Sequence, residues 1–107
     1  MKYKVMIVED QTMPRELFEL RIQASEHFEA ALSIDNAALA DVYCLRFPVD
    51  LILMDVVTRG GESGLDAAER IKRTFPQIKI IIVTSMPECS YLSRAREIGV
   101  ESFWYKE

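Results

Sequence analysis

The sequence predicts an α/β domain in which helices cover both faces of a five-stranded parallel sheet. Short apolar runs alternate with amphipathic stretches along the chain, which is typical of right-handed βαβ units. Several of these runs are apolar almost throughout, as expected of parallel strands buried on both faces. The length of 107 residues suits one compact domain.

Five runs are expected to be strands, and the β-branched segment Ile80–Val83 particularly favours a strand over a helix. The expected strands are Lys4–Val8, Ala30–Ile34, Leu51–Met54, Ile78–Thr84 and Glu101–Tyr105. The third run, Leu51–Met54, is followed directly by Asp55 in the sequence LILMD. The carboxylate of Asp55 is costly to bury without a partner.

Four stretches between the strands have the pattern of amphipathic helices. Thr12 is expected to cap the first, with Pro14 in its first turn, and Asn36 to cap the second, Ala37–Arg46. The third spans Gly64–Phe75, and the fourth runs from Pro87 to Ile98, where Gly99 ends it. The expected inward positions are Leu17, Leu20 and Ala24 in the first helix, Leu39, Val42 and Tyr43 in the second, and Leu65, Ala68, Ile71 and Phe75 in the third.

This order of elements predicts a flavodoxin-like doubly wound sheet with strand order 2-1-3-4-5. The formal net charge of −4 gives no basic patch, so we expect no direct nucleic-acid contact by this domain. Cys44 and Cys89 show no ligand spacing, and no apolar stretch is long enough to span a membrane. The N-terminus is unlike a signal peptide, and the expected location is the cytoplasm.

Polar side chains follow the strands at one edge of the predicted sheet, where doubly wound sheets bind ligands. Glu9 and Asp10 follow the first strand, Asp55 the third, Thr84 ends the fourth, and Lys106 follows the fifth. Three neighbouring carboxylates repel one another unless a cation lies among them. Because Mg²⁺ prefers oxygen ligands and keeps several waters, the pattern predicts a magnesium site with Asp55 as a nucleophile.

The whole chain resembles the receiver domain of bacterial two-component response regulators. The resemblance depends on the ordered set VED at residues 8–10, LILMD ending in Asp55, IIVTS at residues 81–85, and the lysine of FWYKE. It implies that Asp55 accepts a phosphoryl group from a sensor histidine kinase. It further implies that Thr84 hydrogen-bonds the phosphoryl oxygen, Lys106 pairs with it, and Phe103 turns inward as part of the switch.

The same resemblance implies the metal ligands. Asp10 and Asp55 would bind Mg²⁺ directly, Glu9 would act through water, and the carbonyl of Val57 would complete the protein ligands. Such a domain is a switch and not an enzyme in the usual sense, because it catalyses only its own phosphorylation and dephosphorylation.

Several positions depart from the usual receiver pattern. Glu107 stands where a proline usually follows the lysine, which resembles the NarL/LuxR-type subgroup, whose receivers precede a DNA-binding domain. A DNA-binding output outside this chain and a homodimer are therefore among the expected partners. The loop VVTRGGESG after Asp55 carries an extra residue, and apolar Val57 and Met86 predict slow loss of the phosphoryl group.

No fifth helix follows the last strand, so residues 1–107 are interpreted as a receiver domain truncated after strand five. Two alternatives stay open at this point. One is a pseudo-receiver, an interaction module without phosphate chemistry. The other is a haloacid-dehalogenase-type phosphatase, although that family needs a DxD at its first strand, where this sequence reads VEDQ.

Overall fold

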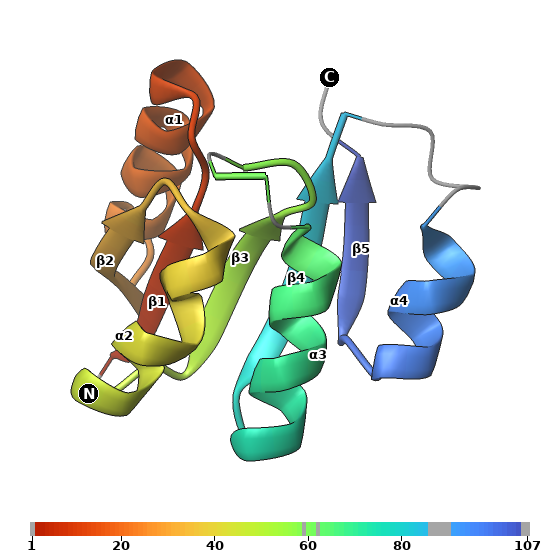
Figure 1. The fold of residues 1–107 in the computed structure, drawn as a ribbon. Coiled ribbons are helices and arrows are strands. Elements are labelled where there is room, and N and C mark those ends of the chain that lie inside the picture. The colour runs from red at the N-terminus through yellow and green to blue at the C-terminus, as the bar shows by residue number, and fades with distance from the viewer. Residues whose placement is uncertain (1, 59, 62, 86–90, 106–107) are drawn as a thin grey trace.

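The computed structural model describes residues 2–58, 60, 61, 63–85 and 91–105. Its centre is a five-stranded parallel sheet in the order β2-β1-β3-β4-β5, as predicted (Figure 1). The strands are β1 (Tyr3–Val8), β2 (Phe28–Ile34), β3 (Leu51–Asp55), β4 (Lys79–Thr84) and β5 (Ser102–Tyr105). Each lies within two residues of its predicted boundary, because buried parallel strands have a nearly continuous apolar sequence.

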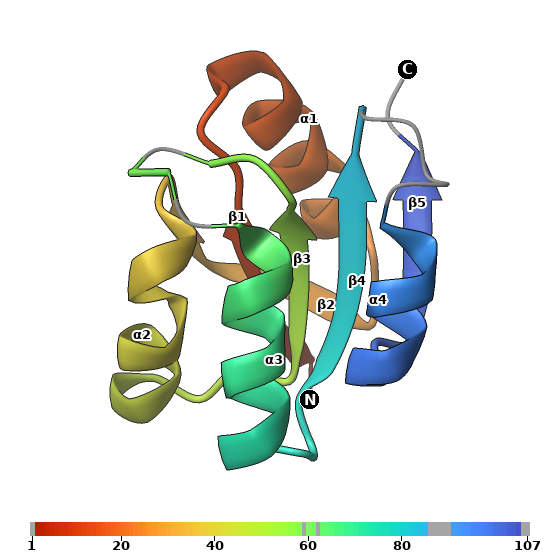
Figure 2. The same ribbon diagram turned by 45° about the vertical axis from the view of Figure 1, so that its right-hand side comes forward.

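Helices cover the two faces of the sheet unequally. The helices are α1 (Thr12–Gln23), the short 3₁₀ helix η1 (Ala37–Leu39), α2 (Ala40–Arg46), α3 (Gly64–Thr74) and α4 (Leu92–Ile98). Figure 2 shows α2, α3 and α4 side by side in front of the sheet, with α1 behind it. Among the described residues, no helix has the length and apolar character needed to cross a membrane.

The larger core lies between the sheet and the helices α2, α3 and α4. The buried positions of α3 include Leu65, Ala68 and Ile71, and Phe75 packs against the same core, as the sequence predicted. Gly99 ends α4 with a positive φ of 90°, as expected for a glycine cap. The predicted start of the fourth helix at Pro87 lies outside the described residues.

The predicted inward face of the second helix was wrong for two of its three residues. Leu39 and Val42 are exposed, whereas Tyr43 packs against the larger core, and the buried residues of this segment are Ala37, Ala40 and Cys44. The buried positions 37, 40 and 44 also have helical spacing, but their small side chains were not predicted to form the inward stripe. Burial, followed by the charge of Asp41, raises the pKa of the Cys44 thiol to about 11, so this cysteine stays protonated at neutral pH.

The face covered by α1 is only partly closed. Phe18 and Ile22 of α1 pack against the sheet, whereas Leu17 and Leu20, predicted to point inward, are exposed. The helix begins at Thr12, and its N-cap is Gln11 without a capping side-chain hydrogen bond, so the predicted Thr12 cap was also wrong. An open groove of about 1300 Å³ runs between α1 and the sheet. Its apolar lining includes Leu17, Leu20, Val5, Leu53, Val83 and Trp104.

Glu101 joins three elements just before β5. Its carboxylate accepts the backbone N–H of Ile80 on β4 at 2.7 Å and the ammonium of Lys72 on α3 at 2.9 Å. Its own N–H donates to the Ile80 carbonyl at 2.9 Å. Although partial burial opposes the charge, the Ile80 N–H and Lys72 hold the pKa of the Glu101 carboxyl below its ordinary value.

Replacing Glu101 by glutamine is therefore expected to destabilise the domain at neutral pH and much less in acid. A lowered folded-state pKa stabilises the fold above the ordinary value of 4.5, and this stabilisation is lost as the pH falls further. Urea unfolding of both proteins at pH 7 and pH 3.5 measures the difference. Glu97→Gln, an exposed change on α4, is the control, and an equal gap at both pH values would contradict the assignment.

Candidate metal and phosphoryl site

Four of the predicted site residues meet at the carboxyl edge of the sheet. Glu9 and Asp10 directly follow β1, Asp55 is the last residue of β3, and Thr84 is the last of β4. These strands are neighbours in the order β1-β3-β4, and parallel pairing brings their carboxyl ends to one edge. The backbone register pairs Asp55 with Val83, so Thr84 lies one residue beyond the level of Asp55.

Glu9, Asp10 and Asp55 form the acidic cluster that the sequence predicted. Each offers a carboxylate oxygen, and these oxygens lie within 4.8 Å of one another. Glu9 is 1% exposed and Asp55 7% exposed, whereas Asp10 is partly exposed to solvent. One Glu9 oxygen accepts the backbone N–H of Gln11 at 3.2 Å, which orients that carboxylate.

The donor set of this cluster fits a hard divalent cation. At 4.8 Å, two carboxylate charges repel by about 3 kcal/mol at an effective dielectric constant near 20. Three oxygen donors from partly buried carboxylates match the preference of Mg²⁺, which completes its octahedron with water and carbonyl oxygens. The cluster could therefore hold a metal ion, and the partly exposed Asp10 leaves a route for water and for a phosphoryl donor.

Gly64 places the end of β3 against the start of α3, a contact that sequence reasoning missed. A Cβ atom at this position would lie 1.9 Å from the backbone oxygen of Asp55. The Gly64 N–H donates to the Val56 carbonyl at 2.8 Å, and Ser63 caps α3 by accepting the Leu65 N–H at 3.1 Å. The backbone that carries the predicted nucleophile is thus fixed by a contact that only glycine permits.

The loop after Asp55, predicted to carry an extra residue, folds back on itself. Val57 and Ser63 form an isolated antiparallel bridge, and Gly60 and Gly61 both have positive φ. Beside this bridge, the Val56 carbonyl accepts the Gly64 N–H at 2.8 Å. The Val57 side chain is exposed.

The predicted switch residues Thr84 and Phe103 differ in their exposure to solvent. Thr84 is 1% exposed, so its hydroxyl lies within the sheet edge and not on the surface. Phe103 on β5 is partly buried, packs against the larger core and is in register with Ile82. Its neighbour Trp104 points to the opposite face and is 50% exposed beside the open groove. Lys106 and Met86, which the sequence also singled out, lie outside the described residues.

Comparison with known proteins decides the family. Residues 5–107 match the family described as the response regulator receiver domain. The chain belongs to this family. Receiver domains of this kind are components of two-component signalling systems and not classical enzymes. The predicted family and fold are therefore confirmed.

Two curated relatives of this receiver are about twice as long as it is. It is 29% identical to the Fimbriae Z protein of Escherichia coli K12 over 99 residues, which cover 92% of this chain and 47% of that protein. It is 27% identical to the oxygen regulatory protein NreC of Staphylococcus haemolyticus over 103 residues, covering 96% and 48%. The receiver thus spans slightly less than half the length of these two relatives.

Solved structures agree with the receiver fold. A DNA-binding response regulator of the LuxR family from Staphylococcus aureus is 25% identical and superposes with a TM-score of 0.87, covering 96% of this chain and 85% of that one. A CheY-like receiver domain protein from Methanospirillum hungatei JF-1 has the same TM-score at 18% identity, covering 99% and 82%, and supports the fold alone.

Proposed function

We propose that this receiver accepts a phosphoryl group on Asp55 from a sensor histidine kinase and relays the change to an output. The observation that carries the proposal is the cluster of Glu9, Asp10 and Asp55, whose oxygens converge within 4.8 Å at the carboxyl edge of a receiver fold. Burying two carboxylates is costly, and a cation bound at this edge would offset that cost.

The proposed reaction is a phosphoryl transfer to a carboxylate. An oxygen of Asp55 attacks the phosphorus, the new P–O bond forms, and the bond from phosphorus to the donor's leaving group breaks. The leaving group is the imidazole of a kinase histidine or the acetate of acetyl phosphate. Mg²⁺ bound by Asp10, Asp55 and the Val57 carbonyl, with Glu9 acting through water, would neutralise charge on the phosphoryl oxygens.

The proposed switch links Thr84 to Phe103. Thr84 would donate its hydroxyl to a phosphoryl oxygen, Lys106 would pair with another, and Phe103 would repack as the end of β4 moves. Support comes from the burial of Thr84 and from the packing of Phe103 against the core on the neighbouring strand. In such two-state coupling, phosphorylation and partner binding favour each other by the same factor.

The proposed output is DNA binding by a domain outside this chain. Two observations support it: a LuxR-family DNA-binding regulator is among the similar structures, and the curated relatives are about twice as long as the receiver. The net charge of −4 argues against DNA contact by the receiver itself. A homodimer and a cytoplasmic location remain parts of the proposal that rest on the family.

The open groove supports the predicted truncation after strand five. The groove has an apolar lining on β1, β3, β4 and β5, and Leu17 and Leu20 of α1 are exposed beside it. An apolar surface of this extent is normally buried against another element. We therefore propose that a further helix of the native chain packs into this groove in the whole regulator.

Incubating the chain with Mg²⁺ and acetyl phosphate tests the proposed function. We expect one phosphoryl group per chain by intact mass, its absence in Asp55→Asn, and its absence when EDTA removes the metal. Glu97→Gln, distant from the site on α4, should be phosphorylated normally. No incorporation into the wild-type chain would favour the pseudo-receiver, and continuous release of phosphate would favour the phosphatase.

A further inference from the structure

We propose that Thr58 is a positioning residue of the metal site, because its hydroxyl holds the loop that presents the Val57 carbonyl. This inference rests on the proposed function and extends it to a residue outside the acidic cluster. Thr58 is 5% exposed although it lies in a connecting loop. Its Oγ1 accepts the backbone N–H of Ala37 at 2.9 Å, across 21 residues of sequence.

The hydrogen bond joins two connections at the same edge of the sheet. Ala37 begins the 3₁₀ helix after β2, and Thr58 lies three residues beyond Asp55 in the loop after β3. Without Thr58, the Ala37 N–H would be a buried donor at a helix start, a group that is costly to leave unsatisfied. This cost favours the observed position of the loop after β3.

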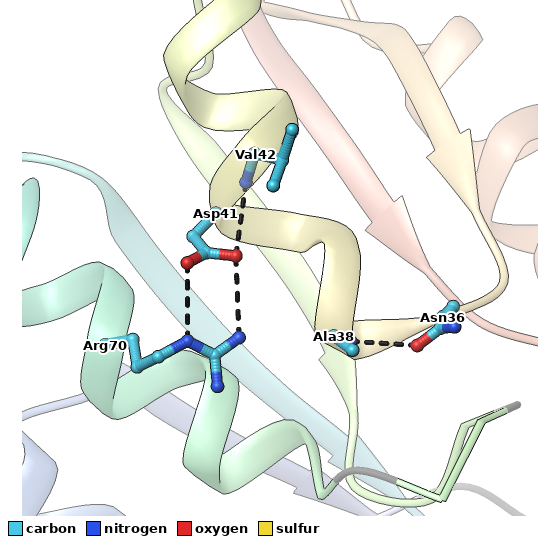
Figure 3. A network of polar contacts seen from close by, with 5 residues as sticks. All are labelled: Asn36, Ala38, Asp41, Val42 and Arg70. Atoms are coloured by element: carbon cyan, nitrogen blue, oxygen red, sulfur yellow. Dashed lines mark hydrogen bonds and ion pairs between the residues drawn. The ribbon is translucent and has the colours of Figure 1, made fainter.

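The Ala37 side of this contact is itself rigid. Asn36 caps the same turn by accepting the Ala38 N–H at 2.9 Å, and Asp41 on α2 binds the guanidinium of Arg70 on α3, with Nε 3.3 Å from Oδ2 (Figure 3). Figure 3 shows both contacts on one continuous segment, so the donor that Thr58 engages cannot easily follow the loop if the loop moves.

Two anchors thus flank Val57 in the sequence. On one side, the Val56 carbonyl accepts the Gly64 N–H at 2.8 Å, and on the other, Thr58 accepts the Ala37 N–H. Val57 itself, between these anchors, forms the bridge with Ser63. A ligand that is fixed on both sides binds an ion with less loss of conformational entropy, so removal of one anchor should weaken the site.

Calorimetric titration of the 107-residue chain with Mg²⁺ tests the proposal. Thr58→Val, which keeps the shape and removes the hydroxyl, should raise the Mg²⁺ dissociation constant about tenfold. Thr58→Ser should restore near wild-type affinity. The matched control is Ser33→Ala, which removes a hydroxyl bonded to Glu19 at 2.6 Å between β2 and α1, and it should leave the affinity unchanged.

The outcomes separate this proposal from the proposed function. Unchanged Mg²⁺ affinity in a folded Thr58→Val chain overturns the role of Thr58 and leaves the function standing. Absence of Mg²⁺ binding by the wild-type chain overturns both. An equal loss of affinity in Ser33→Ala would assign the effect to general destabilisation and would also overturn the positioning role.

Hydrogen exchange of the wild-type chain provides a second test of the role of Thr58. Coupling between two events is reciprocal, so if the Thr58 hydrogen bond favours Mg²⁺, bound Mg²⁺ must favour that bond. Hydrogen exchange at the Ala37 amide should then slow on addition of Mg²⁺ by more than exchange at the Phe47 amide, which donates to Tyr43 at the end of α2. Equal slowing at both amides overturns the proposal, even if Thr58→Val fails to fold.

Discussion

Replacing Gly64 by alanine is expected to destabilise the domain by about 3 kcal/mol or more, which lowers Tm by about 15 °C. The new Cβ would lie 1.9 Å from the backbone oxygen of Asp55 and 2.9 Å from its carbonyl carbon. Neither atom belongs to a flexible side chain, so relief requires that the backbone of β3 or the start of α3 move. Thermal unfolding followed by circular dichroism measures the loss.

Gly99→Ala is the control for this change. Gly99 has a φ of 90°, which costs an alanine about 1–2 kcal/mol, but no atom lies within 4 Å of its added Cβ. We therefore expect Gly64→Ala to lose clearly more stability than Gly99→Ala. If the two variants unfold at the same temperature, the close approach of α3 to Asp55 is wrong.

The same movement should impair the proposed site. Because the Asp55 carboxylate is attached to the displaced backbone, a Gly64→Ala chain that still folds should bind Mg²⁺ more weakly than wild type. Metal sites tolerate little displacement of their ligands, since Mg²⁺ demands near-octahedral geometry. Gly99→Ala, at the far end of α4, should bind Mg²⁺ as the wild type does.

Sequence patterns predicted the sheet because each strand can be recognised from its own run of apolar residues. The apolar runs at β1, β3 and β4 needed no knowledge of partners, and the strand-end position of Asp55 followed from the run that precedes it. The edge rule then brought Glu9, Asp10 and Asp55 together, and their measured proximity agrees with it.

Helix faces were harder to predict because they depend on what covers them. Leu17 and Leu20 have helical spacing, but the sheet contact of α1 is made by Phe18 and Ile22, and the leucines border an open groove. In α2, the small residues Ala40 and Cys44 face the core. Periodicity identifies an apolar stripe, but it cannot tell which part of a broad stripe finds a partner.

Contacts between loops could not be predicted from the sequence. Thr58 and Ala37 are 21 residues apart, and nothing in the composition of either loop indicates that they share a hydrogen bond. A signal did exist at Gly64, because a glycine at the start of an apolar helix needs a reason other than helix propensity. The close approach to Asp55 supplies that reason.

Replacing Asp10 by asparagine is expected to remove most of the stabilisation that Mg²⁺ gives the domain. With Mg²⁺ at about 100 times the wild-type dissociation constant, the wild type gains about 2.7 kcal/mol. The variant loses one of three carboxylates whose oxygens lie within 4.8 Å of one another. It should bind the ion more than tenfold less tightly and therefore gain much less.

The rise in unfolding temperature from EDTA to Mg²⁺ should therefore be clearly larger for the wild type than for Asp10→Asn, and differential scanning calorimetry in both buffers measures it. Glu97→Gln removes the same charge from an exposed position on α4 and should gain as much from Mg²⁺ as the wild type does. If Asp10→Asn also gained as much as the wild type, Asp10 would not be a ligand of the ion. The acidic cluster would then lose its role as the Mg²⁺ site beside Asp55.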